Sequence, residues 1–213
     1  MRRADAMMRV PYISQRSLNA TGAPALPGGG AWRDRSCAIA CMTMILNYHG
    51  RNVTVDDVLI RALERQAFDT NRGWLHSNLV TVLRSFGLAA HRRNWRLLDG
   101  HENQYLAGRS LDEDARLELE NVRSQMLDEG IWRLRQLLSA DLPVTVSVHR
   151  PRGDDSSIGH QVVLLGEDAQ EFIYHDPAQD EGPSLSWPFD NFRNNWKGLA
   201  IIAHSAALSP SKG

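Results

Sequence analysis

The sequence contains few cysteines and no long apolar run. Cys37 and Cys41 are the two cysteines among 213 residues, too few for a disulfide framework. No apolar stretch approaches the roughly 20 residues that a membrane-spanning helix needs. Residues 1–10 contain three arginines, but no apolar segment of the kind found in secretory signals follows them. We therefore expect no membrane span and a cytoplasmic location.

The chain also lacks an excess of charge of either sign. Lys and Arg total 24, Asp and Glu total 25, and the formal net charge is -1. This balance argues against a nucleic acid or an anionic membrane as the partner. With 42% hydrophobic and 23% charged residues, the composition is that of a globular protein. The length favours a single domain over residues 1–213 that is large enough to bury a core.

The first half of the chain has helical patterns. Ser36 is a candidate N-cap and Gly50 a candidate C′ residue, and the residues between them are apolar nearly all round. Such a helix is expected in the middle of a core. Thr54 and Asp57 form a capping box that opens a second helix. A third helix is predicted over about 74–86 and ends at a glycine.

A polar segment follows the third helix. Residues 92–108 are polar and irregular. Ser110 and Glu113 then form a capping box, which predicts a charged helix up to Gly130. Gly130 is expected to separate this helix from a short one over 131–140.

The second half changes to the period of a β-strand. Residues 143–149 alternate and are rich in valine, and 159–166 and 171–175 follow as two further strands joined by a tight turn. A short segment at 189–196 precedes a last strand over 199–204. A helical first half and a mostly antiparallel second half predict an α+β fold around one core.

Cys37 is the first candidate for chemistry. It lies at the predicted start of the central helix, where unpaired N–H groups and the helix dipole stabilise a thiolate. The alternative is an inert thiol in the core, because free cysteines are usually buried. Cys41, one turn further along, is interpreted as a core residue. A metal site is disfavoured, because His49 is too far along the helix to join both thiols at one ion.

His160 and Asp176 are the second and third candidates. His160 begins one predicted strand and Asp176 directly follows the next, although each could be merely structural. A short hairpin would bring them together, so that Asp176 could orient His160 as the base for a Cys37 nucleophile. The Cys37 backbone N–H and the Gln15 side-chain amide could then stabilise an oxyanion.

The order of these residues resembles the papain-like cysteine peptidases. More closely, it resembles family 39 of the cysteine peptidases, the bacteriocin-processing or double-glycine-leader group and its stand-alone relatives. The resemblance implies a papain-like fold, with Cys37 as nucleophile, His160 as general base and acid, Asp176 as orienting carboxylate and Gln15 as oxyanion donor. The matching segments are residues 10–15, 37–50, 143–148, 159–166, 176–178 and 192–202.

Three features distinguish the chain from the family pattern. Ala38 stands where the family usually has a glycine after the nucleophile, and a long gap that contains a glycine-rich loop separates Gln15 from Cys37. Residues 97–129 are interpreted as a helical insertion, which could be a lid, a dimer contact, a substrate-recognition surface or a plain solvated helix. The resemblance implies a stand-alone enzyme with a peptide or protein substrate and without a metal or cofactor.

Three functions remain open at this point. The first is a thiol hydrolase that cleaves a peptide or amide bond through an acyl-enzyme. The second is a thiol acyltransferase that uses the same residues and passes the acyl group to an amine or thiol. The third is a non-catalytic binding module, against which the presence of Cys37, His160 and Asp176 together argues.

Overall fold

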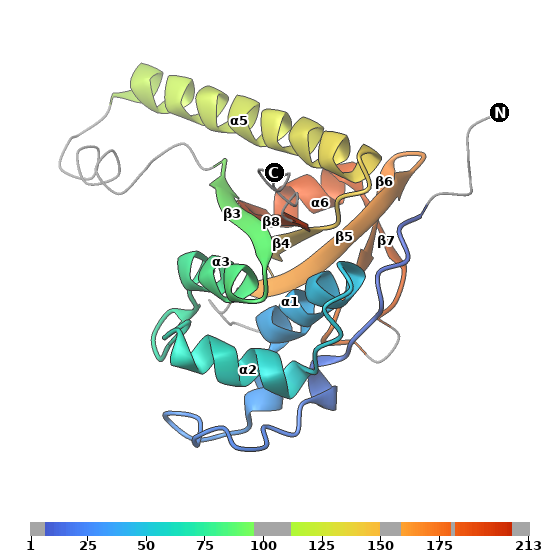
Figure 1. Ribbon diagram of the computed structural model, residues 1–213. Coiled ribbons are helices and arrows are strands. Elements are labelled where there is room, and N and C mark those ends of the chain that lie inside the picture. Colours follow the sequence, from blue (N-terminus) through green and yellow to red (C-terminus); the bar gives the residue numbers. More distant parts are fainter. Residues whose placement is uncertain (1–6, 96–111, 150–158, 180–181, 206–213) are drawn as a thin grey trace, which may run out of the picture.

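The centre of the molecule is a six-stranded antiparallel sheet. The computed structural model describes residues 7–95, 112–149, 159–179 and 182–205. The sheet has the strand order β3-β8-β4-β5-β6-β7 (Figure 1). Its strands are β3 (Leu88–Asn94), β4 (Val144–Val148), β5 (His160–Asp168), β6 (Glu171–His175), β7 (Leu185–Pro188) and β8 (Trp196–Ser205). Every residue of β4 is buried, because helices cover both faces of the sheet at its centre (Figure 1).

Helix α1 (Cys37–Tyr48) is the central helix that the sequence predicts. Its first ten residues are all buried, and it packs against β5. Gly50, with a φ of 72°, ends the helix in the left-handed conformation that glycine adopts without strain. Ser36 stands at the N-cap position but does not cap the helix with its side chain. Its hydroxyl instead donates to the carbonyl oxygens of Gln15 and Arg33, at 3.3 Å each.

The next two helices differ in how well the sequence predicts their starts. Helix α2 (Val55–Glu64) has the predicted capping box, since Thr54 and Asp57 bond each other's backbone N–H groups. Helix α3 (His76–Ser85) begins two residues later than predicted. The delay arises because β2 (Gly73–Trp74) pairs with β1 (Phe68–Asp69) in a small hairpin.

Strand β3 corrects the interpretation of residues 92–108 as irregular. Its last three residues, Arg92 to Asn94, pair with β8, while residues 96–108 lie outside the described part of the chain. Because β3 is at the edge of the sheet, four of its seven side chains are exposed and polar residues can occupy them. The sequence therefore lacks the apolar alternation by which strands are recognised.

Helix α5 (Glu113–Ser139) is continuous, so the predicted break at Gly130 is wrong. A Cβ atom on residue 130 would lie 2.6 Å from the Trp196 ring and 2.9 Å from the Trp95 ring. Glycine is needed there for close packing of the helix on two indoles, and it does not end the helix. The N-cap is Asp112, whose side chain accepts from the Ala115 N–H, and Ser110 lies outside the described residues.

The predicted strands of the second half are confirmed with small changes of length. Strand β8 begins at Trp196, three residues earlier than predicted, and β7 and α6 (Phe189–Asn195) occupy the turn-rich segment before it. One continuous hydrophobic core joins the helices and the sheet, so the α+β fold is confirmed. None of the helices in the described part of the chain has the length and hydropathy needed to cross a membrane.

Candidate active site

Cys37 is the first residue of α1. The N–H groups of a first helical turn have no acceptor within the helix, so they stabilise negative charge at this position. The side chain is largely buried, with an exposed fraction of 8%, but it lines a surface hollow of about 600 Å³. The thiol is therefore held by the core while remaining open to a ligand from one side.

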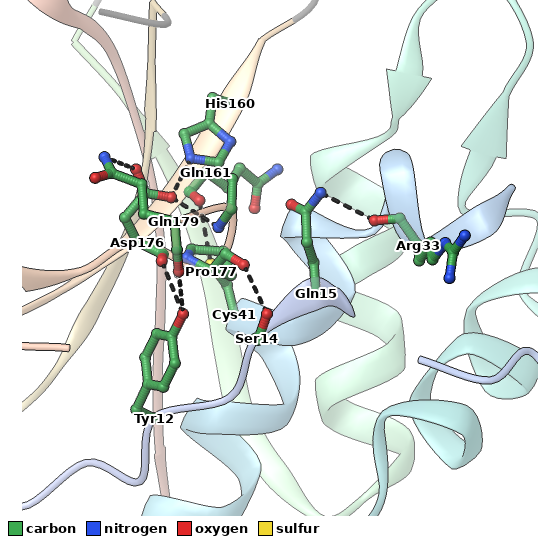
Figure 2. A network of polar contacts seen from close by, with 11 residues as sticks. Tyr12, Ser14, Gln15, Arg33, Cys41, His160, Gln161, Asp176, Pro177 and Gln179 are labelled. Atoms are coloured by element: carbon green, nitrogen blue, oxygen red, sulfur yellow. Dashed lines mark hydrogen bonds and ion pairs between the residues drawn. The ribbon is translucent and has the colours of Figure 1, made fainter. Parts of the chain in front are cut away.

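His160 and Asp176 meet at the end of the β5–β6 hairpin. His160 begins β5 and Asp176 directly follows β6, and the register of the pair places Val163 opposite His175. The Nε2 atom of His160 lies 2.7 Å from Oδ1 of Asp176 (Figure 2). Both side chains are buried, so this hydrogen bond is shielded from water.

The Asp176 carboxylate is held by two further donors. The Ala178 N–H donates to Oδ1 at 2.9 Å, and the Gln179 side-chain amide donates to Oδ2 at 2.9 Å. Burial alone would raise the pKa of Asp176, but the bonds from His160, Ala178 and Gln179 hold it below its ordinary value. Asp176 is therefore a fixed anion beside the imidazole.

Cys37 and His160 shift each other's protonation. Burial alone would raise the pKa of the Cys37 thiol, but His160 and the backbone N–H groups nearby lower it below its ordinary value. Burial alone would lower the pKa of His160, but Asp176 and Cys37 raise it to about 9. The Nδ1 atom of His160 is buried and makes no other hydrogen bond within the described residues. The mutual pKa shifts show that the thiol and the ring lie within interaction range of each other.

Gln15 lies beside this group although it is distant in sequence. Its backbone N–H donates to the Pro177 carbonyl at 2.9 Å, and its own carbonyl accepts from Ser36. These bonds fix the residue between the start of α1 and the Asp176 loop. The Gln15 amide nitrogen donates to the Arg33 carbonyl at 2.9 Å (Figure 2). One of its two N–H groups is thus occupied, and the second would have to serve an oxyanion.

A polar cluster that sequence reasoning missed lies on the other side of Cys37. The His76 Nε2 atom is 2.6 Å from the Ser147 hydroxyl and 3.4 Å from the Gln161 side-chain nitrogen. These residues come from α3, β4 and β5 and share no sequence pattern. Gln161 could have been noted as the neighbour of His160, but nothing in the sequence singles out His76 or Ser147.

Cys41 is a core residue, as predicted. It is fully buried, and its thiol donates to the Gln161 carbonyl at 3.4 Å. Burial, together with the nearby Cys37 and Asp176, raises the pKa of Cys41 well above its ordinary value. His49 lies at the far end of α1, against the Ala203 carbonyl. In the described part of the chain, no three His, Cys, Asp or Glu side chains converge as metal ligands would.

Two adjoining hollows flank the pair of Cys37 and His160. The Cys37 hollow, of about 600 Å³, contains Cys37, Trp74 and His76 in its lining. The His160 hollow, of about 360 Å³, contains Gln15, His160 and Asp176. Asp34 lines both, so the two hollows adjoin at this residue. An extended chain could lie across both.

Comparison with known proteins places the chain in a family. The model of the Peptidase_C39 like family matches residues 7–203. The chain belongs to this family. A search of curated proteins found no match.

Solved structures of C39 peptidases have a similar fold. A Bacillus anthracis protein assigned as a C39-like peptidase has a TM-score of 0.56 and 18% identity, over 93% of this chain and 96% of that one. The peptidase domain of Streptococcus ComA, a bi-functional ABC transporter involved in quorum sensing, has a TM-score of 0.54 and 14% identity, over 81% of this chain and 93% of that one. The predicted papain-like architecture is thereby confirmed, and the family is one of cysteine peptidases.

Proposed function

We propose that this C39-like protein is a thiol hydrolase that cleaves a peptide or amide bond through an acyl-enzyme on Cys37. The observation that carries the proposal is the arrangement of three side chains. The Cys37 thiol lies at a helix start beside a His160 ring, whose other nitrogen is bonded to a buried Asp176 carboxylate. This is the arrangement that nucleophilic acyl transfer requires.

Each residue has a definite role in the reaction. The Cys37 sulfur attacks the scissile carbonyl carbon, and the carbonyl oxygen becomes an oxyanion near the Cys37 N–H and the Gln15 amide. The Nδ1 proton of His160 passes to the leaving nitrogen as the C–N bond breaks, which leaves a thioester on Cys37. His160 then takes a proton from water, the hydroxide attacks the thioester, and the acid product leaves as the thiol is restored.

The two hollows fit the two halves of a substrate. In the thioester the acyl group is bonded to sulfur, so the acyl half belongs in the hollow that Cys37 lines. The leaving nitrogen must receive its proton from His160, so the other half belongs in the hollow that His160 lines. The Cys37 hollow is the larger, so more of the binding contact should come from the acyl half.

The test combines labelling of the thiol with cleavage. Iodoacetamide at pH 6, with mass spectrometry to locate the label, should modify Cys37 quickly and Cys41 not at all, because only Cys37 has a lowered pKa. The variant His160→Ala should slow the labelling of Cys37. A peptide library should give cleavage products with the wild type and none with Cys37→Ala.

Other outcomes would change the assignment. Products joined to an added amine, with little free acid, would indicate an acyltransferase. Slow labelling of Cys37 that does not respond to His160→Ala, together with no cleavage, would contradict the proposal and indicate a binding module.

A further inference from the structure

The Cys37 hollow has an uneven distribution of charge. Among the described residues of its lining, Arg35, Arg72, Arg92 and Lys197 are cationic, and Asp34 alone is acidic. This contrasts with the whole chain, in which the two signs are balanced. Positive charge is therefore gathered where the acyl half of a substrate would lie.

Three separate elements supply the arginines of this hollow. Arg35 directly follows the short 3-10 helix Trp32–Asp34, Arg72 lies in the turn between β1 and β2, and Arg92 lies on the edge strand β3. All three are exposed. The three arginines are far apart in the sequence, and the fold brings them to the lining of one hollow. No basic sequence motif therefore marks them.

The guanidinium groups of these arginines are not used by the fold. Within the described ranges, Arg35, Arg72 and Arg92 make no side-chain hydrogen bond or ion pair. Asp69, in the same turn as Arg72, accepts from the backbone N–H groups of Asn71 and Arg72 instead. By contrast, Arg135 is bonded to Glu167 at 2.6 Å. The arginines of the hollow therefore keep their donors available for a ligand.

An aromatic surface lies among these charges. Phe68 and Trp74 line the hollow and pack against each other, with ring centroids 5.1 Å apart. Trp32 supports them from the core, 5.0 Å from Phe68 and 5.9 Å from Trp74. The hollow thus offers an apolar surface for one side chain and guanidinium groups for neighbouring anions.

We propose that the Cys37 hollow selects peptides with glutamate or aspartate side chains, next to an apolar residue, on the acyl side of the scissile bond. A carboxylate matches the planar fork of an arginine, and a concave site concentrates the field of several like charges. The assignment to the acyl side rests on the proposed function. The preference for acidic peptides is a binding property that can be measured without catalysis.

The first measurement is binding to Cys37→Ala. The probes are two fluorescein-labelled decapeptides of Ala, Phe and Glu or of Ala, Phe and Gln, alike except for this exchange, at pH 7.5 and low salt. An exposed arginine–carboxylate contact changes affinity about two- to threefold, so three contacts predict about tenfold tighter binding of the Glu peptide. Salt should reduce this ratio.

Matched variants locate the effect. Replacing Arg35, Arg72 and Arg92 by Gln should bring the ratio of affinities close to one. Replacing Arg116, Arg123 and Arg133 by Gln changes the net charge equally and should leave the ratio unchanged, because these exposed residues of α5 line neither hollow. Asp34→Asn should raise the ratio of affinities, which gives a second test if the variant with Arg35, Arg72 and Arg92 replaced fails to fold.

Several results would overturn the proposal. These are equal affinity for the two peptides, a ratio of affinities that is unchanged when the three arginines of the Cys37 hollow are replaced, or a ratio that falls equally in the α5 control. Binding of the oligonucleotide dT10 as tight as that of the Glu peptide, with the same arginine dependence, would assign the hollow to a different polyanion.

Cleavage separates this proposal from the proposed function. If wild type cleaves internally quenched Glu and Gln peptides equally well, the hydrolase assignment stands and the acidic preference falls. If no peptide is cleaved but the arginine-dependent binding persists, the acidic preference stands and the hydrolase assignment falls.

Discussion

The variant Asp176→Asn tests how the structure activates the Cys37 thiol. It removes the negative charge that lies 2.7 Å from His160 Nε2 and keeps an oxygen that can accept the same hydrogen bond. A less stabilised imidazolium is a weaker partner for the thiolate, so the pKa of Cys37 should rise. The wild-type pKa of Cys37 is lowered largely through His160, which makes the direction of this change unambiguous.

The size of the effect follows from the pKa of His160. Asp176 and Cys37 together raise it from 6.5 to about 9. The loss of charge weakens a charge-assisted hydrogen bond by roughly 1 kcal/mol, which corresponds to a rise of about one unit in the pKa of Cys37. At a pH below the pKa of Cys37 in both proteins, the thiolate fraction should then fall about tenfold.

The assay is the rate of Cys37 alkylation by iodoacetamide between pH 5 and pH 10. Asp176→Asn should react about tenfold more slowly than wild type at the acid end of this range, and the two rates should converge at the alkaline end, where the thiol ionises in both proteins. Gln179→Leu is the matched control, because it removes one bond to Asp176 and keeps the charge, and it should change the rate much less. Rates equal to those of wild type over the whole range would refute the reasoning, and an equal fall at every pH would indicate a damaged fold.

Gly130→Ala should lower the free energy of unfolding by about 1–2 kcal/mol in denaturant melts, because overpacking against two buried indoles outweighs the gain in helix propensity. Gly166→Ala is the control, because no heavy atom lies within 4 Å of its new Cβ, and its free energy of unfolding should stay within about 0.5 kcal/mol of wild type. Gln15→Ala should reduce peptide hydrolysis about 100-fold while alkylation at pH 6 is unchanged, and parallel losses in both assays would contradict a role in oxyanion binding. Cys41→Ala should leave alkylation and hydrolysis unchanged and cost about 1 kcal/mol of stability, so a loss of labelling would be evidence against its role as a core residue. Hydrolysis by wild type should decline as the pH rises through about 9, because the raised pKa of His160 keeps the ring protonated up to that pH. Above it, the ring has no proton to give to the leaving nitrogen. A decline that begins near pH 6.5 would contradict this prediction.

The parts of the fold that follow from local patterns could be predicted. The central helix α1 is apolar all round and bounded by Ser36 and Gly50, and the buried strands β4 and β5 have apolar runs between turns. The edge strand β3 was missed, because its exposed side chains follow no apolar period. Gly130 was misread as a break, because its packing against Trp196 depends on residues far along the chain.

The candidate site likewise has parts that follow from local patterns and parts that depend on long-range contacts. The contact between His160 and Asp176 could be predicted from the sequence, because one begins and the other follows two strands that are joined by a tight turn. His76 could not be found, because its neighbours at the site belong to other elements. The bond from Gln15 to the Arg33 carbonyl also depends on tertiary structure, since a glycine-rich loop separates this pair.

The positions of Cys37 and His160 along the chain have a consequence for biosynthesis. Cys37 is made early, whereas β5 and the Asp176 loop belong to the last quarter of the chain. On the ribosome the helix that carries the thiol emerges long before the imidazole that lowers its pKa. A nascent chain therefore exposes only an ordinary thiol, and nucleophilic reactivity arises when the long-range contacts between α1 and the β5–β6 hairpin form. Completion of the sheet is thus the folding step that brings the imidazole to the thiol.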